Sequence, residues 1–148
     1  MKAPMAGVAT AGVTPKVVGT FGSKGDGAVL FYSIWDITQI PGGDNLLVSD
    51  LVRVQVFRAD GSFVRELAQV GKVNGRLHQP TAIACGENGE LFIPEEKIHR
   101  VSVFQSDGTF LRCFGTEGNG PAQLHDPCGA ACDRKGYSLS FDPSWQRS

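Results

Sequence analysis

The stretch "RVQVFRADGSFVRELA" at residues 53–68 decides the fold, because residues 100–115 repeat it as "RVSVFQSDGTFLRCFG". The two copies are identical at eight of sixteen positions and lie 47 residues apart. Each copy places an Asp-Gly pair between two apolar runs, which is the strongest short signal for a β-hairpin. A repeat of this length indicates that one structural unit recurs along the chain.

The repeat extends beyond the hairpin into the neighbouring segments. Three glycine-rich loops match one another, namely "FGSKGDGAVLF" (21–31), "LAQVGKVNGRL" (67–77) and "FGTEGNGPAQL" (114–124). The middle copy holds four short apolar segments, "TAIAC", "ELFIP", "RVSVF" and "TFLRCF", separated by turn residues. A unit of this size with four strands is a propeller blade. The sequence therefore predicts an all-β fold, an incomplete β-propeller of four-stranded antiparallel blades stacked through Val54, Val101, Phe57 and Phe104.

The middle copy resembles the NHL repeat. It carries "P-x-x-I-A", "G-E-L-F-I-P-E" and "H-R-V-S-V-F-x-x-D-G-T-F-L-R-C-F-G" in order, and His99-Arg100 matches the basic pair of that family. The first copy departs from the pattern, because it is two residues shorter before Arg53 and has Val52 in place of the histidine. The resemblance covers roughly residues 17–147. It implies a propeller of about two and a half blades, fewer than the roughly 4–8 that close a ring.

The repeat divides the chain into an N-terminal tail (1–15) and a propeller segment (16–147). Within the segment we expect blades over about 34–68 and 81–115 and a partial blade over 128–147. An open arc of this kind exposes apolar blade faces and strand edges. We expect one of three solutions: a fragment of a longer chain, an open arc capped by its tails, or a homodimer that completes the propeller.

Composition and charge restrict the class of protein. The net charge is −1 and no block of like charge occurs, which does not favour nucleic acid or an acidic membrane as a partner. No apolar run approaches the length of a membrane helix, and the N-terminus lacks a Leu-rich signal sequence. The four cysteines are few and irregularly spaced, which fits a reducing compartment. These features predict a cytoplasmic protein.

No motif predicts catalysis or a cofactor. The glycine loops lack the Lys-Ser/Thr pair and the helix of a phosphate loop, and no nucleophile elbow or zinc-protease motif occurs. "HDPCGAAC" places His125, Cys128 and Cys132 close together, but zinc prefers four ligands and no fourth lies nearby. We therefore predict no metal, no cofactor and no enzymatic activity.

The candidate binding residues are Arg53, Arg100, Arg147, His99 and Trp35. The three arginines recur once per blade, either as a guanidinium ring that binds an acidic peptide or phosphate, or as braces within the repeat. The bracing alternative is favoured because a carboxylate precedes each arginine: Asp50, Glu95 and Asp142. His99 and Trp35 fall at expected loops or strand ends, where an exposed aromatic side chain could anchor a partner.

The sequence predicts a non-catalytic binding or scaffold module with a protein partner. The NHL resemblance also implies substrate recognition for a ubiquitin ligase, although no RING or B-box cysteine pattern is present. One alternative is an RNA-binding surface, which some similar propellers have. Another is a fragment of a metal-dependent enzyme resembling the peptide-amidating lyase, whose axial metal is held by histidines. This chain has only His78, His99 and His125.

Overall fold

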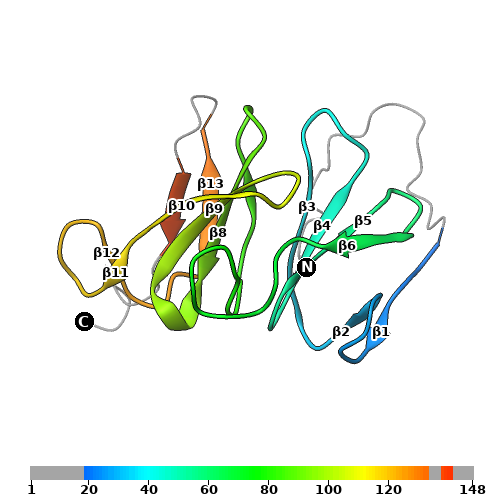
Figure 1. The fold of residues 1–148 in the computed structure, drawn as a ribbon, viewed down its shortest axis with the longest axis horizontal. Coiled ribbons are helices and arrows are strands. Elements are labelled where there is room, and N and C mark those ends of the chain that lie inside the picture. Colours follow the sequence, from blue (N-terminus) through cyan, green and yellow to red (C-terminus); the bar gives the residue numbers. More distant parts are fainter. Residues whose placement is uncertain (1–18, 134–137, 142–148) are drawn as a thin grey trace, which may run out of the picture.

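A computed structural model of the chain describes residues 19–133 and 138–141. Two four-stranded antiparallel sheets stand next to each other (Figure 1). The first sheet contains β3 (Ile34–Gln39), β4 (Leu46–Asp50), β5 (Val54–Phe57) and β6 (Phe63–Glu66), in that spatial order. The second contains β7 (Ala84–Cys85), β8 (Glu90–Glu95), β9 (Arg100–Gln105) and β10 (Phe110–Phe114).

Shorter elements connect and follow these two sheets. β1 (Ser23–Lys24) pairs in parallel with β2 (Leu30–Phe31), and β11 (Thr116–Glu117) pairs likewise with β12 (Gln123–Leu124). β13 (Gly129–Cys132) pairs antiparallel with β14 (Ser138–Phe141). The helical element of the described residues is one 3-10 turn, η1 (Glu96–Ile98). No helix in this part of the chain has the length and apolar character needed to cross a membrane.

The predicted all-β fold of four-stranded antiparallel sheets is confirmed. The two sheets do not close into a ring within the described residues. The predicted tail (1–15), Arg147 and Asp142 lie outside those residues. The glycine-rich loop 67–77 connects the first sheet to the second, and the loops 21–31 and 114–124 carry the short pairs β1–β2 and β11–β12.

Equivalent Asp-Gly turns form the outer hairpins of both sheets. The carboxylates of Asp60 and Asp107 accept the N–H of the residue two positions later, each at 2.8 Å. Hydrogen bonds from the side chain and backbone of Ser62 lower the pKa of Asp60, and those from the backbone and side chain of Thr109 lower the pKa of Asp107. Gly108 adopts φ of 92° and lies so close to the Leu67 carbonyl oxygen that a Cβ would collide with it. The glycine therefore serves both the turn and the approach to the neighbouring blade.

The main core lies between the two sheets. Phe104 and Val56 are fully buried there, and Ile83 is 4% exposed. The remaining buried members come from both blades and from the loop between them: Leu47, Val54, Leu67, Leu77, Leu91 and Ile93. Burial of this apolar surface against a second sheet is the dominant stabilising contribution. The expected stacking residues Val54, Val101, Phe57 and Phe104 are all buried.

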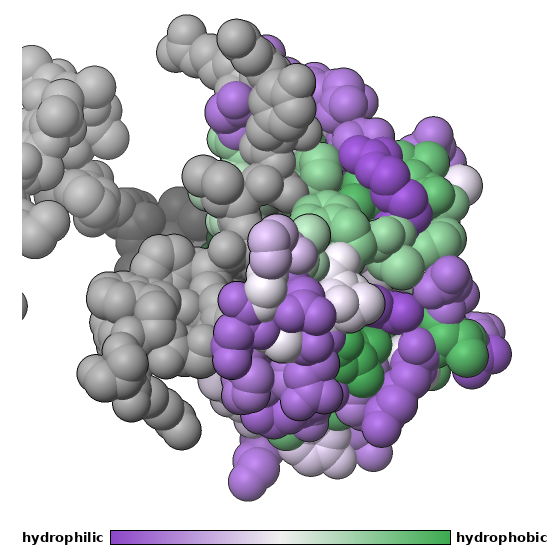
Figure 2. Space-filling model, turned by 90° about the vertical axis from the view of Figure 1, so that its left-hand side faces the viewer, coloured by the Kyte–Doolittle hydropathy of each residue, from purple (hydrophilic) through white to green (hydrophobic). Residues whose placement is uncertain are grey.

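Two smaller clusters occupy the outward faces of the pair. One places Phe31, Val48 and Phe57 between β2 and the first sheet. The other packs Phe92 and Val103 of the second sheet against partly buried residues of the following segments, among them Leu124 and Ala130. On the side that carries β10–β13, apolar side chains reach the surface between polar ones (Figure 2). The face between the blades therefore holds the largest of the three apolar clusters.

Candidate functional site

Arg100 lies in a buried network at one end of the second sheet. Its Nε donates to the Glu95 carboxylate at 2.8 Å, and Glu95 is fully buried. The Ser102 hydroxyl and the backbone N–H of His78 also donate to this carboxylate. The other guanidinium nitrogens donate to the preceding glycine-rich loop, at Asn74 Oδ1 and the carbonyl oxygens of Val73 and Arg76. Arg100 therefore ties its blade to the loop that leads into it.

Arg53 makes the same connection in the first sheet. Its Nη2 donates to the carbonyl oxygens of Gly27 and Leu30, at 2.8 and 3.1 Å. Its Nη1 donates to Glu66 at 2.7 Å, and its Nε lies 3.7 Å from Asp50. The structure thus brings the recurring arginines together with the recurring carboxylates of the described blades. These contacts agree with the expectation that the arginines brace the repeat. Binding of an external anion by Arg53, Arg100 or Arg147 stays a prediction.

The connection between β8 and β9 positions His99. β8 ends at Glu95, η1 follows, and His99 ends η1 with φ of 53°. This left-handed conformation is uncommon for residues with a Cβ, although histidine is enriched among those that adopt it. Asp50 and Arg53 of the first blade are two residues closer in sequence than Glu95 and Arg100, and Val52 stands at the position of His99. Two additional residues therefore place an imidazole at the end of the second blade only.

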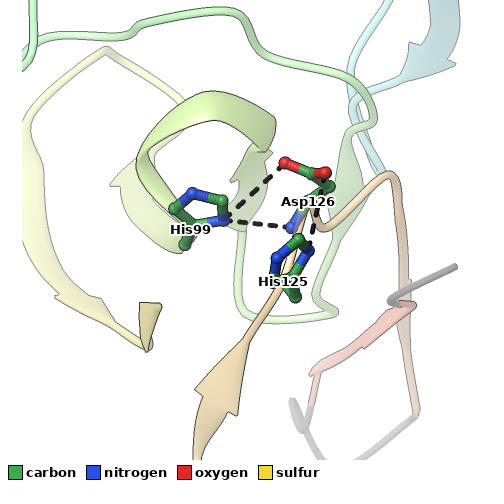
Figure 3. Close-up of side chains that lie close together, drawn as sticks. All are labelled: His99, His125 and Asp126. Atoms are coloured by element: carbon green, nitrogen blue, oxygen red, sulfur yellow. Dashed lines mark hydrogen bonds and ion pairs between the residues drawn. The ribbon is translucent and has the colours of Figure 1, made fainter. Parts of the chain in front are cut away.

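His125 and Asp126 lie between β12 and β13 and face His99 (Figure 3). The Asp126 N–H donates to His99 Nδ1 at 3.1 Å. The Asp126 carboxylate lies between the two rings, with Oδ1 at 3.8 Å from His99 Nδ1 and Oδ2 at 3.5 Å from His125 Nδ1. Asp126 has φ of 48°, and the equivalent Gln79 has φ of 51°, so this backbone conformation belongs to the repeat.

Two charged side chains border the His99–His125–Asp126 cluster. Glu117 on β11 places its carboxylate 3.8 Å from His99 Nε2, and Lys97 places its ammonium 3.7 Å from Asp126. The His99 side chain is 16% exposed, whereas His125 and Asp126 are 42% and 35% exposed. One imidazole is thus held firmly in place, while the other two groups are open to solvent. The cluster is therefore accessible from the surrounding solution.

The three side chains offer chemistry that the sequence did not assign to them. Each supplies one potential metal-ligating atom, and these atoms lie within 4.8 Å of one another. The sequence grouped His125 with Cys128 and Cys132, whereas the structure groups it with His99 and Asp126. His99 was expected as a partner anchor. The signal that could have revealed the cluster is the longer β8–β9 connection, which aims His99 at the "HDP" of the next copy.

A second candidate surface lies on the outward face of the first sheet. In the first sheet Thr38 pairs with Leu47, and in the second sheet Ala84 pairs with Phe92 at the equivalent position. Ile37 and Ile83 directly precede Thr38 and Ala84, so they are equivalent residues of the two blades. Ile37 is 56% exposed and Ile83 only 4%. Further exposed apolar side chains lie near Ile37 on the same sheet and the segment before it, and we call the whole set the first-blade face: Phe21, Tyr32, Ile34, Trp35 and Ile37.

No protein-family model and no curated protein sequence matches the chain. Solved structures do match it. A protein from Bacteroides fragilis NCTC 9343 to which export is attributed is 15% identical, with a TM-score of 0.61 over 82% of this chain and 38% of its own. A catalytically inactive virginiamycin B lyase from Staphylococcus aureus, with quinupristin, is 17% identical, with a TM-score of 0.51 over 74% and 41%.

These likenesses show the fold, which is all-β and propeller-like. The chain spans about two fifths of the length of these neighbours. The NHL assignment is not confirmed, because no family model matches, and it stays a resemblance. One of the two neighbours is a lyase, so this fold can carry an active site, which weakens the expectation of a non-catalytic chain.

The predicted cytoplasmic location is contradicted by the same comparison, because export is attributed to the Bacteroides neighbour. The prediction rested on four sparse cysteines and on the lack of a Leu-rich leader. Sparse cysteines do not identify a compartment, since an exported protein with a sufficient apolar core needs no disulfides.

Proposed function

We propose that this chain is a propeller-type binding module whose first-blade face docks a protein partner. One observation carries the proposal: Ile37 is 56% exposed at the position where the equivalent Ile83 is buried between two blades. A β-branched apolar residue on a strand stabilises the fold only when another surface covers it. The face around Ile37 therefore has the composition of a packing surface without its partner.

The other residues of the first-blade face support a protein as the occupant. Tyr32 and Trp35 are 48% and 52% exposed, and such side chains are enriched at the energetic centres of protein interfaces. A depression of about 360 Å³ lies beside them, lined by Phe21, Phe31 and Ile34 among others. Phe21, Tyr32 and Ile34 border the same depression, and exposed apolar side chains gathered in this way mark interaction sites in soluble proteins.

The partner that fits this face is a β-sheet with an apolar surface. The first sheet already accepts such a sheet on its other side, where the second blade covers it through Ile83, Leu91 and Phe104. A second sheet can bury the first-blade face in the same manner. A role of this chain in substrate recognition for a ubiquitin ligase stays a prediction from the NHL resemblance.

The RNA-binding alternative has less support. A surface that binds RNA needs arginine and lysine side chains that are free to reach phosphates. Arg53 and Arg100 instead donate to carboxylates and carbonyl oxygens of the chain itself, and their side chains are 8% and 11% exposed. Arg53 and Arg100 therefore hold the blades to their loops, which leaves their side chains little freedom to reach RNA phosphates.

Site-specific photo-crosslinking in cells that express the chain tests the proposal. A photoreactive amino acid replaces Ile37 in one variant and Val73 in a control variant, since Val73 is also exposed, at 63%, but lies in a glycine-rich loop. We expect a discrete protein adduct from position 37 that is absent from position 73. Equal labelling at both positions, or none at position 37, would contradict the proposal.

The solution mass of the purified chain tests whether the partner is a second copy of the chain. If the partner is a second copy, light scattering gives twice the chain mass, and Ile37→Glu returns it to one chain because a buried charge at the interface is costly. If the wild-type chain has the mass of one chain, the crosslinked adduct must contain a different protein. If the chain is a dimer and Ile37→Glu leaves it a dimer, the two copies associate through a surface other than the first-blade face.

A further inference from the structure

The hydrogen bond between Asp126 and His99 fixes the tautomer of the His99 ring. Because Nδ1 accepts the Asp126 N–H, its lone pair faces that N–H, and the proton of the neutral ring is on Nε2. A histidine that binds a metal through Nδ1 needs the same tautomer. The fold therefore presents His99 in the form that a metal ion would use.

The other two groups supply donors to the same space (Figure 3). The Asp126 carboxylate oxygens lie 3.8 Å from His99 Nδ1 and 3.5 Å from His125 Nδ1. Ligand atoms around a tetrahedral zinc ion with bonds of about 2.0–2.1 Å are about 3.3 Å apart. The two contacts involve different oxygens of the carboxylate, and the three potential ligand atoms all lie within 4.8 Å of one another, so small side-chain rotations would bring them to this spacing. We propose that His99, His125 and Asp126 bind a divalent first-row metal ion, with Zn²⁺ as the preferred ion.

Glu117 completes the arrangement on the far side of the His99 ring. Its carboxylate lies 3.8 Å from Nε2, the nitrogen that carries the proton. Metal-bound imidazoles usually donate their second N–H to a carboxylate, which orients the ring and strengthens it as a ligand. Glu117 is a positioning residue in this site, because it contacts His99 and not the metal.

Two features limit the affinity of the site. The metal must take the Nδ1 lone pair that the Asp126 N–H occupies, so one hydrogen bond is lost on binding. The Lys97 ammonium lies 3.7 Å from Asp126 Oδ1 and competes for that oxygen. The Lys97 contact involves Asp126 Oδ1, whereas Asp126 Oδ2 faces His125 Nδ1 at 3.5 Å.

The equivalent junction between the first and second blades lacks the site. There Val52 replaces His99 and Gln79 replaces Asp126, while His78 is retained in place of His125. The same backbone conformation at residue 79 therefore presents no carboxylate and no second imidazole. The proposed metal site is therefore specific to the second junction.

Three protein ligands with solvent access are typical of exchangeable or catalytic zinc rather than of closed structural zinc.

Competition between the purified full chain and a chromophoric zinc chelator, under reducing conditions, tests the proposal. We expect one zinc ion per chain for the wild type. His99→Gln should weaken binding at least tenfold, and Glu117→Gln should weaken it by about tenfold through the orientation of His99. The matched control His78→Gln, in the junction without the site, should bind as the wild type does.

Lys97→Ala gives a test that misfolding cannot imitate. Because this variant removes a charge that competes for Asp126, zinc should bind about two- to fivefold more tightly. Unchanged or weaker binding by a folded Lys97→Ala chain would contradict the proposed use of the Asp126 carboxylate. Binding of zinc should also raise the melting temperature of the wild-type chain.

The cysteines provide the rival site. If Cys128→Ser abolishes zinc binding while His99→Gln retains it, the metal is held by His125 with Cys128 and Cys132, and the proposal is overturned. Cobalt substituted for zinc distinguishes the two directly, because thiolate ligands add intense near-ultraviolet absorption that nitrogen and oxygen ligands lack. Absence of any bound zinc in the wild-type chain would also overturn the proposal.

Discussion

The two complete blades have equivalent strands and equivalent bracing arginines, but the contact between each arginine and its buried carboxylate differs. In the first blade, Asp50 precedes Arg53 by three residues, the contact between them is 3.7 Å, and the facing Asp50 Oδ2 and Arg53 Nε form no hydrogen bond. In the second, Glu95 precedes Arg100 by five residues and contacts it at 2.8 Å. Two added residues and one added methylene therefore complete the network, and the same two residues carry His99 into place.

The largest effect should come from breaking the network of the second blade. Glu95→Gln removes the charge that faces Arg100 in a site with no solvent exposure, and we expect a loss of about 3–5 kcal/mol in the free energy of unfolding. Asp50→Asn should cost less than half as much, because its contact with Arg53 is longer. Urea denaturation of both variants measures this difference.

An exposed ion pair serves as the reference for these two variants. Glu90 and Arg112 form two charge-assisted hydrogen bonds at 2.9 and 3.0 Å on the outside of the second blade. Glu90→Gln should change stability by only about 0–1 kcal/mol, because solvent screens exposed charges. An equal cost for Glu90→Gln and Glu95→Gln would show that burial does not govern the bracing network.

A somewhat smaller effect should separate the two equivalent isoleucines. Ile83→Ala opens a cavity between the blades and should cost about 2–4 kcal/mol. Ile37→Ala, at the matching position of the first-blade face, should change stability by no more than about 0.5 kcal/mol. Thermal melts of the two variants measure the contrast. A large cost at Ile37 would indicate that another surface covers it in solution.

The smallest effect concerns a feature that the two blades share. Hydrogen bonds from Ser62 and Thr109 lower the pKa of Asp60 and Asp107, so each charged carboxylate contributes stability above its unfolded pKa of about 3.9. That contribution is lost as pH falls through the lower folded pKa. Asp60→Asn and Asp107→Asn should each make the free energy of unfolding less dependent on pH in the acid range. Acid titration of the urea midpoint should give matching curves for the two variants.

The sequence predicts most of the repeat architecture. The strands of the second blade, the two Asp-Gly hairpins and the carboxylate partners of Arg53 and Arg100 all follow from residues that recur at a fixed interval. The inner strand "TAIAC" is shorter than expected and begins at Ala84. The Ile83 N–H donates instead to the Asp36 carboxylate of the neighbouring blade at 2.8 Å, a contact that no local pattern contains.

The metal-ligating cluster lies beyond what the pattern predicts. His99 and Asp126 are 27 residues apart, and their contact depends on left-handed backbone at both positions. Neither residue type forces that conformation. The sequence shows that the β4–β5 connection is shorter than the β8–β9 connection, but not that the longer one forms a 3-10 turn aimed at the following loop. Only the packing of successive copies brings the two segments together.

The arginine braces have a consequence for how such a chain can grow. Each arginine fastens the loop immediately before its own blade, so the contact joining two neighbours is encoded within one stretch of about 47 residues. A duplication of that stretch would therefore carry its own fastening and require no compensating change elsewhere. Stability in such an array rises by nearest-neighbour increments. Copy number can thus change by whole units, while a novelty such as the His99 turn remains confined to one junction.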